Sequence, residues 1–559
     1  MVSYSYNFFE LPGFSKLFID FINKEPFFGS RFPSNSELFG NGSFLEKQNN
    51  FKRDRQGFIS VINDSMNCVS ISGKQAANIK TLANENAFAV VTGQQVGFFG
   101  GPLYTVLKTC TTIELSEKLN SYYKNKSGFV PVFWLEDNDH DNLEASQAAI
   151  FDKEYKIEHL FCMEGVSKAD RTCVSERQFD KTVKTALEKI EEILPETKYK
   201  NDLILKLRKI YKPGESWGDA FITLFNSWFG SKGLLFIKAS EVRKKGLCKE
   251  PVMRELQTIG KSEEIIDRAN TLLEQSGYHI QAKSFGVNLF FHDKNERYRI
   301  NKVSPDSSAS LKIAKRQDDT QFDCNGKIFS YDELIKLAEK EPRLFSPNVL
   351  LRPVFQDYIL PTAAYIGGPS EIGYTAQIKE LYEYFSVPMP AFLPRHSASI
   401  INSHSARFLD KQKLEPLYFT KKFEEIESEL NNILFDKNIE KLFMKTRSQI
   451  TKNYEEIKNE SAKIDPTLIR TGAAACHKSL EHLDSLEKKI QTAQKRVHEM
   501  IYAQYRQVSN FFYPEGTMQE RMFSAINFMN LTGEEQFLNL LDELTKGGVD
   551  RHCFVNFVL

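Results

Sequence analysis

The fold of this chain is decided by residues 87–144, AFAVVTGQQVGFFGGPLYTVLKTCTTIELSEKLNSYYKNKSGFVPVFWLEDNDHDNLE. Two short apolar runs, Ala87–Val91 and Val130–Leu135, flank a segment whose apolar residues recur at helical spacing. That order is typical of a strand, a crossover helix and a second, parallel strand. Because ligands bind beyond the carboxyl ends of the strands in an open parallel sheet, the polar residues after each run are candidates for a site. The stretch therefore predicts an α/β fold with a Rossmann-like parallel sheet.

A glycine-rich segment follows the first run. Its glycines allow positive φ and close approach of a ligand to backbone N–H groups. Pro102 suits the first position of the next helix, whose N-terminus favours phosphate or carboxylate. The pattern is neither G-x-G-x-x-G nor a P-loop, so a plain tight turn is the alternative to an anion or nucleotide site. The candidate substrate- or nucleotide-binding residues here are Thr92, Gly93, Gln94, Gln95, Gly97, Gly100 and Gly101.

An acidic loop, EDNDHDNLE at residues 136–144, follows the second run. Crowded carboxyl groups shift each other's pKa values and an imidazole titrates near neutrality, so general acid/base chemistry is available. A solvated acidic turn is one alternative, and a metal site of His140 with Asp139 or Asp141 is another. Metal-binding histidines usually recruit a second His or a Cys, so no metal ligand is assigned. The candidate catalytic residues are His140, Asp139 and Asp137, and Asp141 and Glu144 are candidate binding residues.

A third polar region lies far downstream, where strands are predicted at Val349–Leu351 and Thr362–Ile366. Arg352 and Arg395 flank predicted strands and would grip a carboxylate or phosphate, with a structural ion pair as the alternative. Glu371 lies in the first turn of a predicted helix, where it either caps the helix or holds a substrate amine. The candidate binding residues of this region are Arg352, Gln356, Tyr365, Gly367, Gly368, Glu371 and Arg395.

These regions predict one shared geometry. Residues 94–101 and 137–144 should converge on a single water-filled notch at the same edge of the sheet, because parallel strands end together there.

Composition narrows the class of protein. The chain of 559 residues is too long for one core, so two to four domains are expected. Basic and acidic residues number 73 each, so the bulk charge gives no reason to expect nucleic acid or an anionic membrane as a partner. Neither a signal-peptide pattern nor a run of about 18 apolar residues is present. The eight cysteines form no C-x-x-C pair, which predicts reduced thiols in a cytoplasmic protein.

The remaining sequence alternates between sheet-like and inserted character. A strand is predicted at Gln147–Phe151, helices at Thr182–Leu194 and Trp217–Phe229, and a hairpin that turns at residues 293–296. The predicted parts are residues 1–150 (N-terminal part of the core), 151–215 (insertion), 216–300 (core continuation), 301–340 (second small insertion), 341–408 (core completion), 409–512 (coiled-coil arm) and 513–559 (C-terminal helices).

The predicted arm rests on a heptad pattern. One helical segment begins near Phe423 and is interrupted by Pro466 and Gly472. The following segment has apolar residues at alternating spacings of three and four: Leu483, Leu486, Ile490, Ala493, Val497 and Met500. This pattern favours an antiparallel coiled-coil hairpin, and a long amphipathic helix packed on its own domain is the alternative.

The motifs together resemble those of the cysteine ligases of bacillithiol biosynthesis (BshC). The resemblance rests on VTGQQVGFFGGPLYTVLK at residues 91–108 and PVFWLEDNDHDNLEA at 131–145. It continues in SPNVLLRPVFQDYILPTAAYIGGPSEIGYTAQI at 346–378, VPMPAFLPR at 387–395 and LEKKIQTAQKRVHE at 486–499. These segments occur in order over essentially the whole chain, which makes the resemblance far more specific than a single glycine loop.

The resemblance implies an amide-forming ligase that joins the carboxyl group of cysteine to the amine of glucosaminyl malate, the last step of bacillithiol formation. It also implies a homodimer formed through the arm. The cofactor is not assigned; ATP is the simplest activator, because condensing a carboxylate with an amine in water is uphill. We expect the glycine loop and the helix start to hold phosphate or malate carboxylates, and His140 or Asp139 to deprotonate the attacking amine.

Two other functional classes stay open. A doubly wound sheet also serves nucleotide-dependent transferases acting on sugar or acyl acceptors. Alternatively, the arm is the functional part and the chain is a non-catalytic assembly protein. The product formed from ATP, cysteine and the sugar malate separates the first class, and ligand-induced thermal shifts separate the second.

Overall fold

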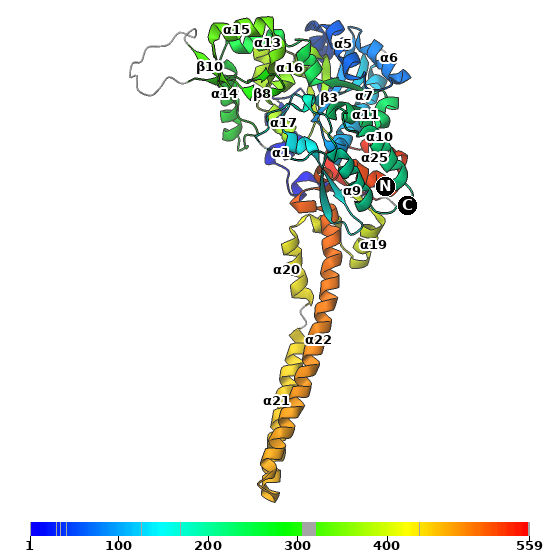
Figure 1. Ribbon diagram of the computed structural model, residues 1–559, viewed down its shortest axis with the longest axis vertical. Helices are drawn as coiled ribbons and strands as arrows, with labels where there is room; N and C mark the ends of the chain where they lie inside the picture. The colour runs from blue at the N-terminus through cyan, green and yellow to red at the C-terminus, as the bar shows by residue number, and fades with distance from the viewer. Residues whose placement is uncertain are drawn as a thin grey trace, which may run out of the picture. The chain divides into compact units, whose positions relative to one another are not determined.

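The computed structural model describes residues 2–29, 31–33, 35–40, 42–124, 126–167, 169–303, 320–434 and 437–556. Residues 304–319, part of the second predicted insertion, lie outside these described residues. The chain forms two compact units, one of Met1–Phe408 with Thr517–Leu559 and the other of Leu409–Gly516. The first unit contains the sheets, and the second contains long helices (Figure 1).

A parallel five-stranded sheet lies in the first unit, in the order β14-β13-β2-β3-β6. The strands are β2 (Ala87–Gln95), β3 (Gly128–Glu136), β6 (Leu235–Lys238), β13 (Thr362–Gly367) and β14 (Ala391–Pro394). The chain moves outward from β2 to β6, then returns to the other side of β2. The inner strands are buried on both faces, which is why they are apolar without alternation. The predicted Rossmann-like sheet is confirmed.

The start of the glycine-rich segment has a different structure from the predicted loop. Strand β2 continues to Gln95 and pairs residue by residue with β3 as far as Glu136. Gly93, Gln94 and Gln95 are therefore strand residues, not loop residues. Helix α7 (Leu103–Tyr123) follows, and Pro102 is its N-cap with ψ 155°, one position before the predicted one, because its backbone is still extended.

The predicted strand at Val349–Leu351 is wrong. These residues form a turn in which Asn348 Oδ1 accepts hydrogen bonds from the backbone N–H groups of Leu350 and Leu351. The real strand is β12 (Phe345–Pro347), just before the turn. Helix α16 (Arg352–Ile359) begins directly after the turn and tolerates Pro353 in its first turn, where the backbone N–H has no intrahelical partner.

The first unit contains further helices. The helical pattern after Gly368 is two helices rather than one, α17 (Pro369–Thr375) and α18 (Lys379–Phe385). The N-terminal elements are β1 (Val2–Asn7), α1 (Lys16–Ile22), α2 (Pro26–Gly29), α3 (Asn35–Leu38), α4 (Ser43–Asn50), α5 (Arg55–Ser65) and α6 (Gly73–Leu82). Those after β6 are α12 (Ala239–Lys244), α13 (Lys249–Gln257) and α14 (Lys261–Gln275).

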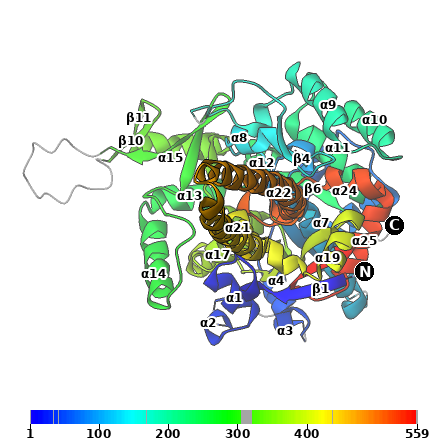
Figure 2. The ribbon, with the colours of Figure 1, turned by 90° about the horizontal axis from the view of Figure 1, so that it is seen from below.

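The inserted segments contain small antiparallel sheets. The strand predicted at Gln147–Phe151 is β4, paired with β5 (Ile157–Phe161), and the hairpin predicted at residues 293–296 joins β7 (Leu289–Asp293) to β8 (Glu296–Arg299). Strands β10 (Gln321–Cys324) and β11 (Lys327–Ser330) pair with each other and lie beside helix α15 (Tyr331–Lys340) (Figure 2). The further elements are α8 (Asn142–Ser146), α9 (Thr182–Ile193), α10 (Lys200–Ile210), α11 (Trp217–Phe229), β9 (Asn301–Lys302), β10 (Gln321–Cys324), β11 (Lys327–Ser330) and α15 (Tyr331–Lys340).

The C-terminal segment rejoins the first unit and includes a strand that the helical pattern did not predict. Strand β16 (Arg551–Asn556) lies between β1 and β15 (Ser397–Ile401), antiparallel to the former and parallel to the latter. The helices of this segment are α23 (Gln519–Met522), α24 (Ala525–Thr532) and α25 (Glu534–Thr545). Helix α19 (Ser403–Gln412) crosses the boundary between the two units.

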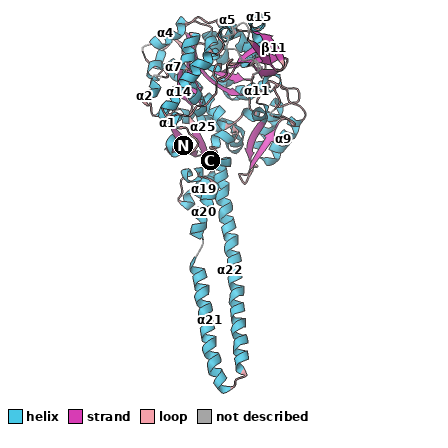
Figure 3. Ribbon diagram, turned by 90° about the vertical axis from the view of Figure 1, so that its left-hand side faces the viewer, coloured by secondary structure: helices cyan, strands magenta, loops and turns pink. Residues whose placement is uncertain are grey.

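The second unit is a helical hairpin. Helices α21 (Lys437–Ile464) and α22 (Leu468–Phe512) lie side by side, after α20 (Phe423–Leu434) (Figure 3). They are antiparallel, because Arg447 pairs with Asp484 and Tyr454 with Ser479. Pro466 lies in the connecting turn as predicted, but Gly472 does not interrupt the helix and lies inside α22. No helix in the described parts of the chain has the length and apolar character that a membrane span needs.

Candidate active site

A cavity of about 250 Å³ lies beyond the carboxyl ends of β2 and β13. This is where the strand order reverses, since β2 leads to β3 on one side and lies next to β13 on the other. At such a position the loops leave the sheet in opposite directions and open a crevice. The predicted site residues that line it are Gly93, Gln94, Gln95, Arg352, Gln356, Tyr365, Gly368, Glu371 and Arg395.

The floor of the cavity is a buried ion pair. Lys108 of α7 is 1% exposed and lies 2.5 Å from Glu371 Oε2. Its ammonium also donates to the Gly93 carbonyl at 2.7 Å and to Gln94 Oε1 at 3.1 Å. Burial lowers the pKa of Lys108, and the Glu371 carboxylate opposes that shift. Lys108 was not among the predicted site residues, although its position four residues after Tyr104 places both on one face of a helix that is buried almost all round.

Glu371 is held from three sides. Besides Lys108, the Tyr365 hydroxyl donates to Oε1 at 2.7 Å and the Gly368 N–H donates to Oε2 at 2.7 Å. Burial, followed by the nearby Glu371 charge, raises the pKa of Tyr365 well above its usual value, so the phenol stays a donor. Both predicted roles of Glu371 thus remain compatible, since it caps α17 and lines the cavity.

Cations exceed anions on the cavity wall. The lining includes Arg352, Arg395 and Arg521 as well as Lys108, against the carboxylates of Glu136 and Glu371. Arg352 Nε lies 3.0 Å from Glu136 Oε2, and the Arg395 guanidinium is 5.4 Å from the ring centroid of Tyr104. This arrangement favours a ligand with carboxylate or phosphate groups.

The acidic loop lies behind this wall. Asp139 accepts hydrogen bonds from Gln95 Nε2 at 2.7 Å and Arg297 Nη2 at 2.8 Å, and it is 3.6 Å from Arg352 Nη2. Burial alone would raise the pKa of Asp139, but Arg297 and Arg352 hold it well below its usual range. The carboxylate is therefore ionised and positions Gln95 and Arg352, both of which line the cavity.

His140 has two cationic neighbours. Arg297 Nε lies 3.0 Å from Nδ1, and Arg171 Nη1 lies 2.7 Å from Nε2. Burial and then Arg297 lower the pKa of His140, so the imidazole is neutral near pH 7. Arg297 comes from the β7–β8 hairpin and is 4% exposed. No motif marked this arginine, because the hairpin is far from the loop in sequence.

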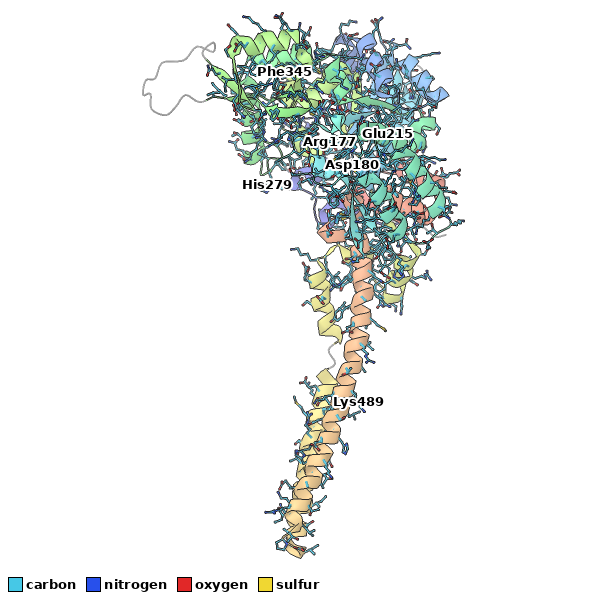
Figure 4. The ribbon with its side chains drawn as sticks, in the orientation of Figure 1. Arg177, Asp180, Glu215, His279, Phe345 and Lys489 are labelled. Atoms are coloured by element: carbon cyan, nitrogen blue, oxygen red, sulfur yellow. The ribbon has the colours of Figure 1, made fainter. Side chains whose placement is uncertain are left out.

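The remaining acidic-loop residues have local structural partners. Asp137 accepts from the Ser240 N–H at 2.8 Å and hydroxyl at 2.6 Å, and burial raises its pKa to about 6. Asp141 caps α8 by accepting from the Glu144 N–H, and burial followed by Asp141 raises the pKa of Glu144. Arg177, labelled in Figure 4, donates to Asn142 Oδ1 at 3.2 Å. The predicted residues Asp137, Asp139, His140, Asp141 and Glu144 are not among those lining the cavity.

Residues 97–101, the later part of the same glycine-rich segment, also lie away from the cavity. The N–H groups of Gly100 and Gly101 donate to the carbonyls of Gly97 and Phe98. The first N–H of α7, on Leu103, donates to the Phe523 carbonyl at 2.8 Å. Three of the N–H donors expected to hold an anion are thus already bonded within the protein. Gly97, Gly100, Gly101, Thr92 and Gly367 are not lining residues, and the Thr92 hydroxyl donates to the Ile366 carbonyl at 2.9 Å.

The predicted convergence holds only in part. Gln95 and Glu136 are paired in register, so both loops begin at the same edge of the sheet. Only the residues at the strand ends reach the cavity, because the loops themselves are packed behind it. Within the described residues, no cluster of three or more His, Cys, Asp or Glu side chains is arranged to hold a metal ion.

Comparison with known proteins matches both units. The profile for "Bacillithiol biosynthesis BshC, N-terminal Rossmann-like domain" matches residues 4–396, and that for the C-terminal coiled-coil domain matches residues 398–553. Three proteins named "Putative cysteine ligase BshC" are similar. That of Chloroherpeton thalassium is 32% identical over 86% of this chain and 85% of its own length. That of Chlorobaculum tepidum is 29% identical over 96% and 94%, and that of Staphylococcus aureus 28% over 88% and 89%. The chain therefore belongs to the BshC family of bacillithiol biosynthesis.

Proposed function

We propose that this protein is a cysteine ligase that forms an amide between the carboxyl group of L-cysteine and the amine of glucosaminyl malate, giving bacillithiol. The observation that carries the proposal is the cavity at the strand-order reversal, which combines three arginines with the Lys108–Glu371 pair. An acidic sugar amine needs cations for its malate carboxylates and a carboxylate for its amine, and side chains of both kinds line the cavity.

The carboxyl group of cysteine must be activated before the amine attacks. Direct condensation would expel water and is uphill, so ATP is proposed to supply the leaving group by phosphoryl or adenylyl transfer. The new C–N bond then forms as phosphate or AMP departs, and the amine loses a proton. The arginines of the wall suit the anionic groups of both co-substrates.

The proposed residue roles use the side chains that line the cavity. Arg352, Arg395 and Arg521 are proposed to bind carboxylate or phosphate groups, and Glu371 to accept a hydrogen bond from the attacking amine. His140 and Asp139 do not reach the cavity, so direct deprotonation by either is replaced here by a positioning role. Proton removal is assigned to a carboxylate of the wall, Glu371 or Glu136.

A reconstitution tests the proposal. Purified protein, glucosaminyl malate, cysteine and ATP are incubated together, and the thiol product is identified by mass spectrometry. The expected product has the mass of the two substrates less one water, and omission of each component in turn identifies the activator. A nucleotidylated acceptor instead would favour a transferase. Absence of thermal shifts with any component would favour an assembly protein.

The proposal includes a homodimer formed through the helical hairpin. Leu486, Val497 and Met500 of the heptad pattern on α22 are 50, 51 and 64% exposed. Apolar side chains repeated at this spacing are the positions that a second copy would cover. Sedimentation of wild type against Leu486→Lys with Val497→Lys tests this: a dimer that becomes a monomer is expected, and an unchanged mass contradicts it. All eight cysteines are free thiols, which supports the proposed cytoplasmic location.

A further inference from the structure

We infer that Glu520 is a positioning residue of the cavity, fixing the guanidinium of Arg395 so that its Nε edge faces an acidic ligand. The identity of that ligand rests on the proposed function, whereas the geometry does not. Glu520 lies in α23, 125 residues after Arg395 in sequence and within the same compact unit. No sequence motif connects the two residues, because the whole helical hairpin separates them.

The contact between them is bidentate. Glu520 Oε2 accepts from Arg395 Nη1 at 2.9 Å, and Oε1 accepts from Nη2 at 2.7 Å. Glu520 is fully buried and Arg395 is 4% exposed. Two parallel charge-assisted bonds fix both the position and the plane of a guanidinium, which a single bond would not do. Arg395 therefore has one orientation relative to the cavity that it lines.

This orientation leaves one donor free. Arg395 Nη1 also donates to the His396 carbonyl at 2.9 Å, so the Nη edge is used within the protein. Arg395 Nε is buried and has no hydrogen-bond partner among the described residues. A Cβ added to Gly368, which also lines the cavity, would lie 3.7 Å from this nitrogen. A buried N–H without an acceptor is unfavourable, and a ligand carboxylate or phosphate oxygen would satisfy it.

Glu520 is itself held by the small sheet of β1, β16 and β15. Ser397 Oγ donates to Oε1 at 2.8 Å, and the Ala398 N–H donates to Oε2 at 2.8 Å. The Ser397 hydroxyl is in turn 2.8 Å from His552 Nδ1 on β16. The next residue, Arg521, lines the cavity directly. The segment that follows the helical hairpin thus contributes one lining residue and the support of another.

The test separates positioning from stability. Glu520→Gln keeps the shape of the side chain but replaces one acceptor oxygen by an NH2 group, which faces the Arg395 guanidinium and cannot accept its hydrogen bond. We expect the KM for glucosaminyl malate to rise about tenfold, with kcat and the KM for cysteine within about a factor of two. In an Arg395→Lys background the same substitution should add no further rise, because the residue acts through Arg395.

Glu255→Gln is the matched control. Glu255 is a carboxylate of similar burial that accepts from Ser262 Oγ and the Asn288 N–H and does not line the cavity. It should lower Tm without changing either KM. If Glu520→Gln behaves in the same way, or if its effect is additive with Arg395→Lys, the inference is overturned. Should Glu520→Gln fail to fold, Ser397→Ala replaces it, with a rise in KM of about twofold to threefold expected and an unchanged KM contradicting the inference.

A binding measurement keeps the two proposals apart. L-malate alone should raise the Tm of wild-type protein, and this shift should be lost in Glu520→Gln. If wild type forms no amide product but shows the malate shift and its loss, the proposed function fails and the inference stands. If wild type turns over with the same KM in Glu520→Gln, the inference fails and the function stands. No malate shift and no turnover in wild type overturns both.

Discussion

Two glycine-rich turns follow neighbouring strands of the parallel sheet and differ in what their backbones do. After β2, residues 97–101 form a turn in which the N–H groups of Gly100 and Gly101 bond to the carbonyls of Gly97 and Phe98. A Cβ on Gly100 would lie 3.0 Å from Phe225, so this turn is covered by aromatic packing. After β13, Gly368 lines the cavity and its N–H holds Glu371 there.

Glycine content alone therefore does not identify a site that holds a ligand. Glycine serves the first turn through its conformation, since Gly100 has φ +84°, and through its lack of a side chain in a packed region. It serves the second turn by leaving space between two charged side chains, Glu371 and Arg395. Whether a glycine-rich turn can bind a ligand depends on whether the hydrogen-bond donors around it are already bonded within the protein. The partners of those donors come from distant parts of the chain.

The largest effect is expected from Glu371→Gln, which removes the charge that the second turn holds. The kcat/KM should fall about 100-fold, because the variant loses the carboxylate proposed to bind the amine and leaves the Lys108 ammonium without its ion-pair partner. Steady-state kinetics measure this. Glu380→Gln is the control, since Glu380 also pairs with a buried cation, Arg31, outside the cavity. Equal kcat/KM in both variants would contradict a role of Glu371 in the reaction.

Gly97→Ala is expected to affect stability rather than activity. The added Cβ would lie 2.7 Å from Gly101 Cα, a backbone atom that cannot move aside easily. The free energy of unfolding should fall by about 1–3 kcal/mol, while activity per folded molecule is retained. Denaturant titration with activity assays of the folded fraction checks this. Intact stability with weakened ATP or malate binding would show instead that the first turn is a ligand cradle.

Gly368→Ala should produce the reverse pattern with a smaller effect. The new Cβ would lie 3.3 Å from Glu371 Oε2, and φ at this residue is −83°, which alanine adopts without strain. The KM for glucosaminyl malate should rise about threefold to fivefold, and the unfolding free energy should change by less than about 1 kcal/mol. A stability loss equal to that of Gly97→Ala would erase the distinction between the two turns.

Asp137→Asn gives the smallest expected effect and concerns the acidic loop. Burial raises the pKa of Asp137 from 3.8 to about 6, so its contribution to stability is present below pH 4 and is lost as pH rises toward 6. Asparagine does not titrate. The Tm of wild type minus that of the variant should therefore decrease, by on the order of 2 °C, between pH 4 and pH 7. Scanning calorimetry measures it, and a difference that is constant with pH would contradict a buried, titrating Asp137.

Local patterns were sufficient for several elements of the first unit. Strand β4, helix α11 and the β7–β8 hairpin form where their periodicity predicts them, because each pattern depends on neighbours in sequence. The Val349–Leu351 prediction failed for a side-chain reason, since Asn348 supplies acceptors that make a turn of an apolar run. Lys108 was missed because a single lysine in an amphipathic helix is normally interpreted as a surface residue. Its burial depends on the pairing with Glu371, which is distant in sequence.

Apolar periodicity and long motifs were enough to predict the Rossmann-like sheet, the coiled-coil domain and the family, because both are properties of contiguous residues. Nine predicted residues line the cavity, and they lie at or just beyond the ends of β2, β13 and β14 or in helices α16 and α17. Which loops reach the cavity, and which residues support it, depends instead on how distant segments of the chain pack together. Arg297, Glu520 and Arg521 arrive from segments far from the sheet strands in sequence. Their contributions depend on where the chain returns, and no local pattern carries that information.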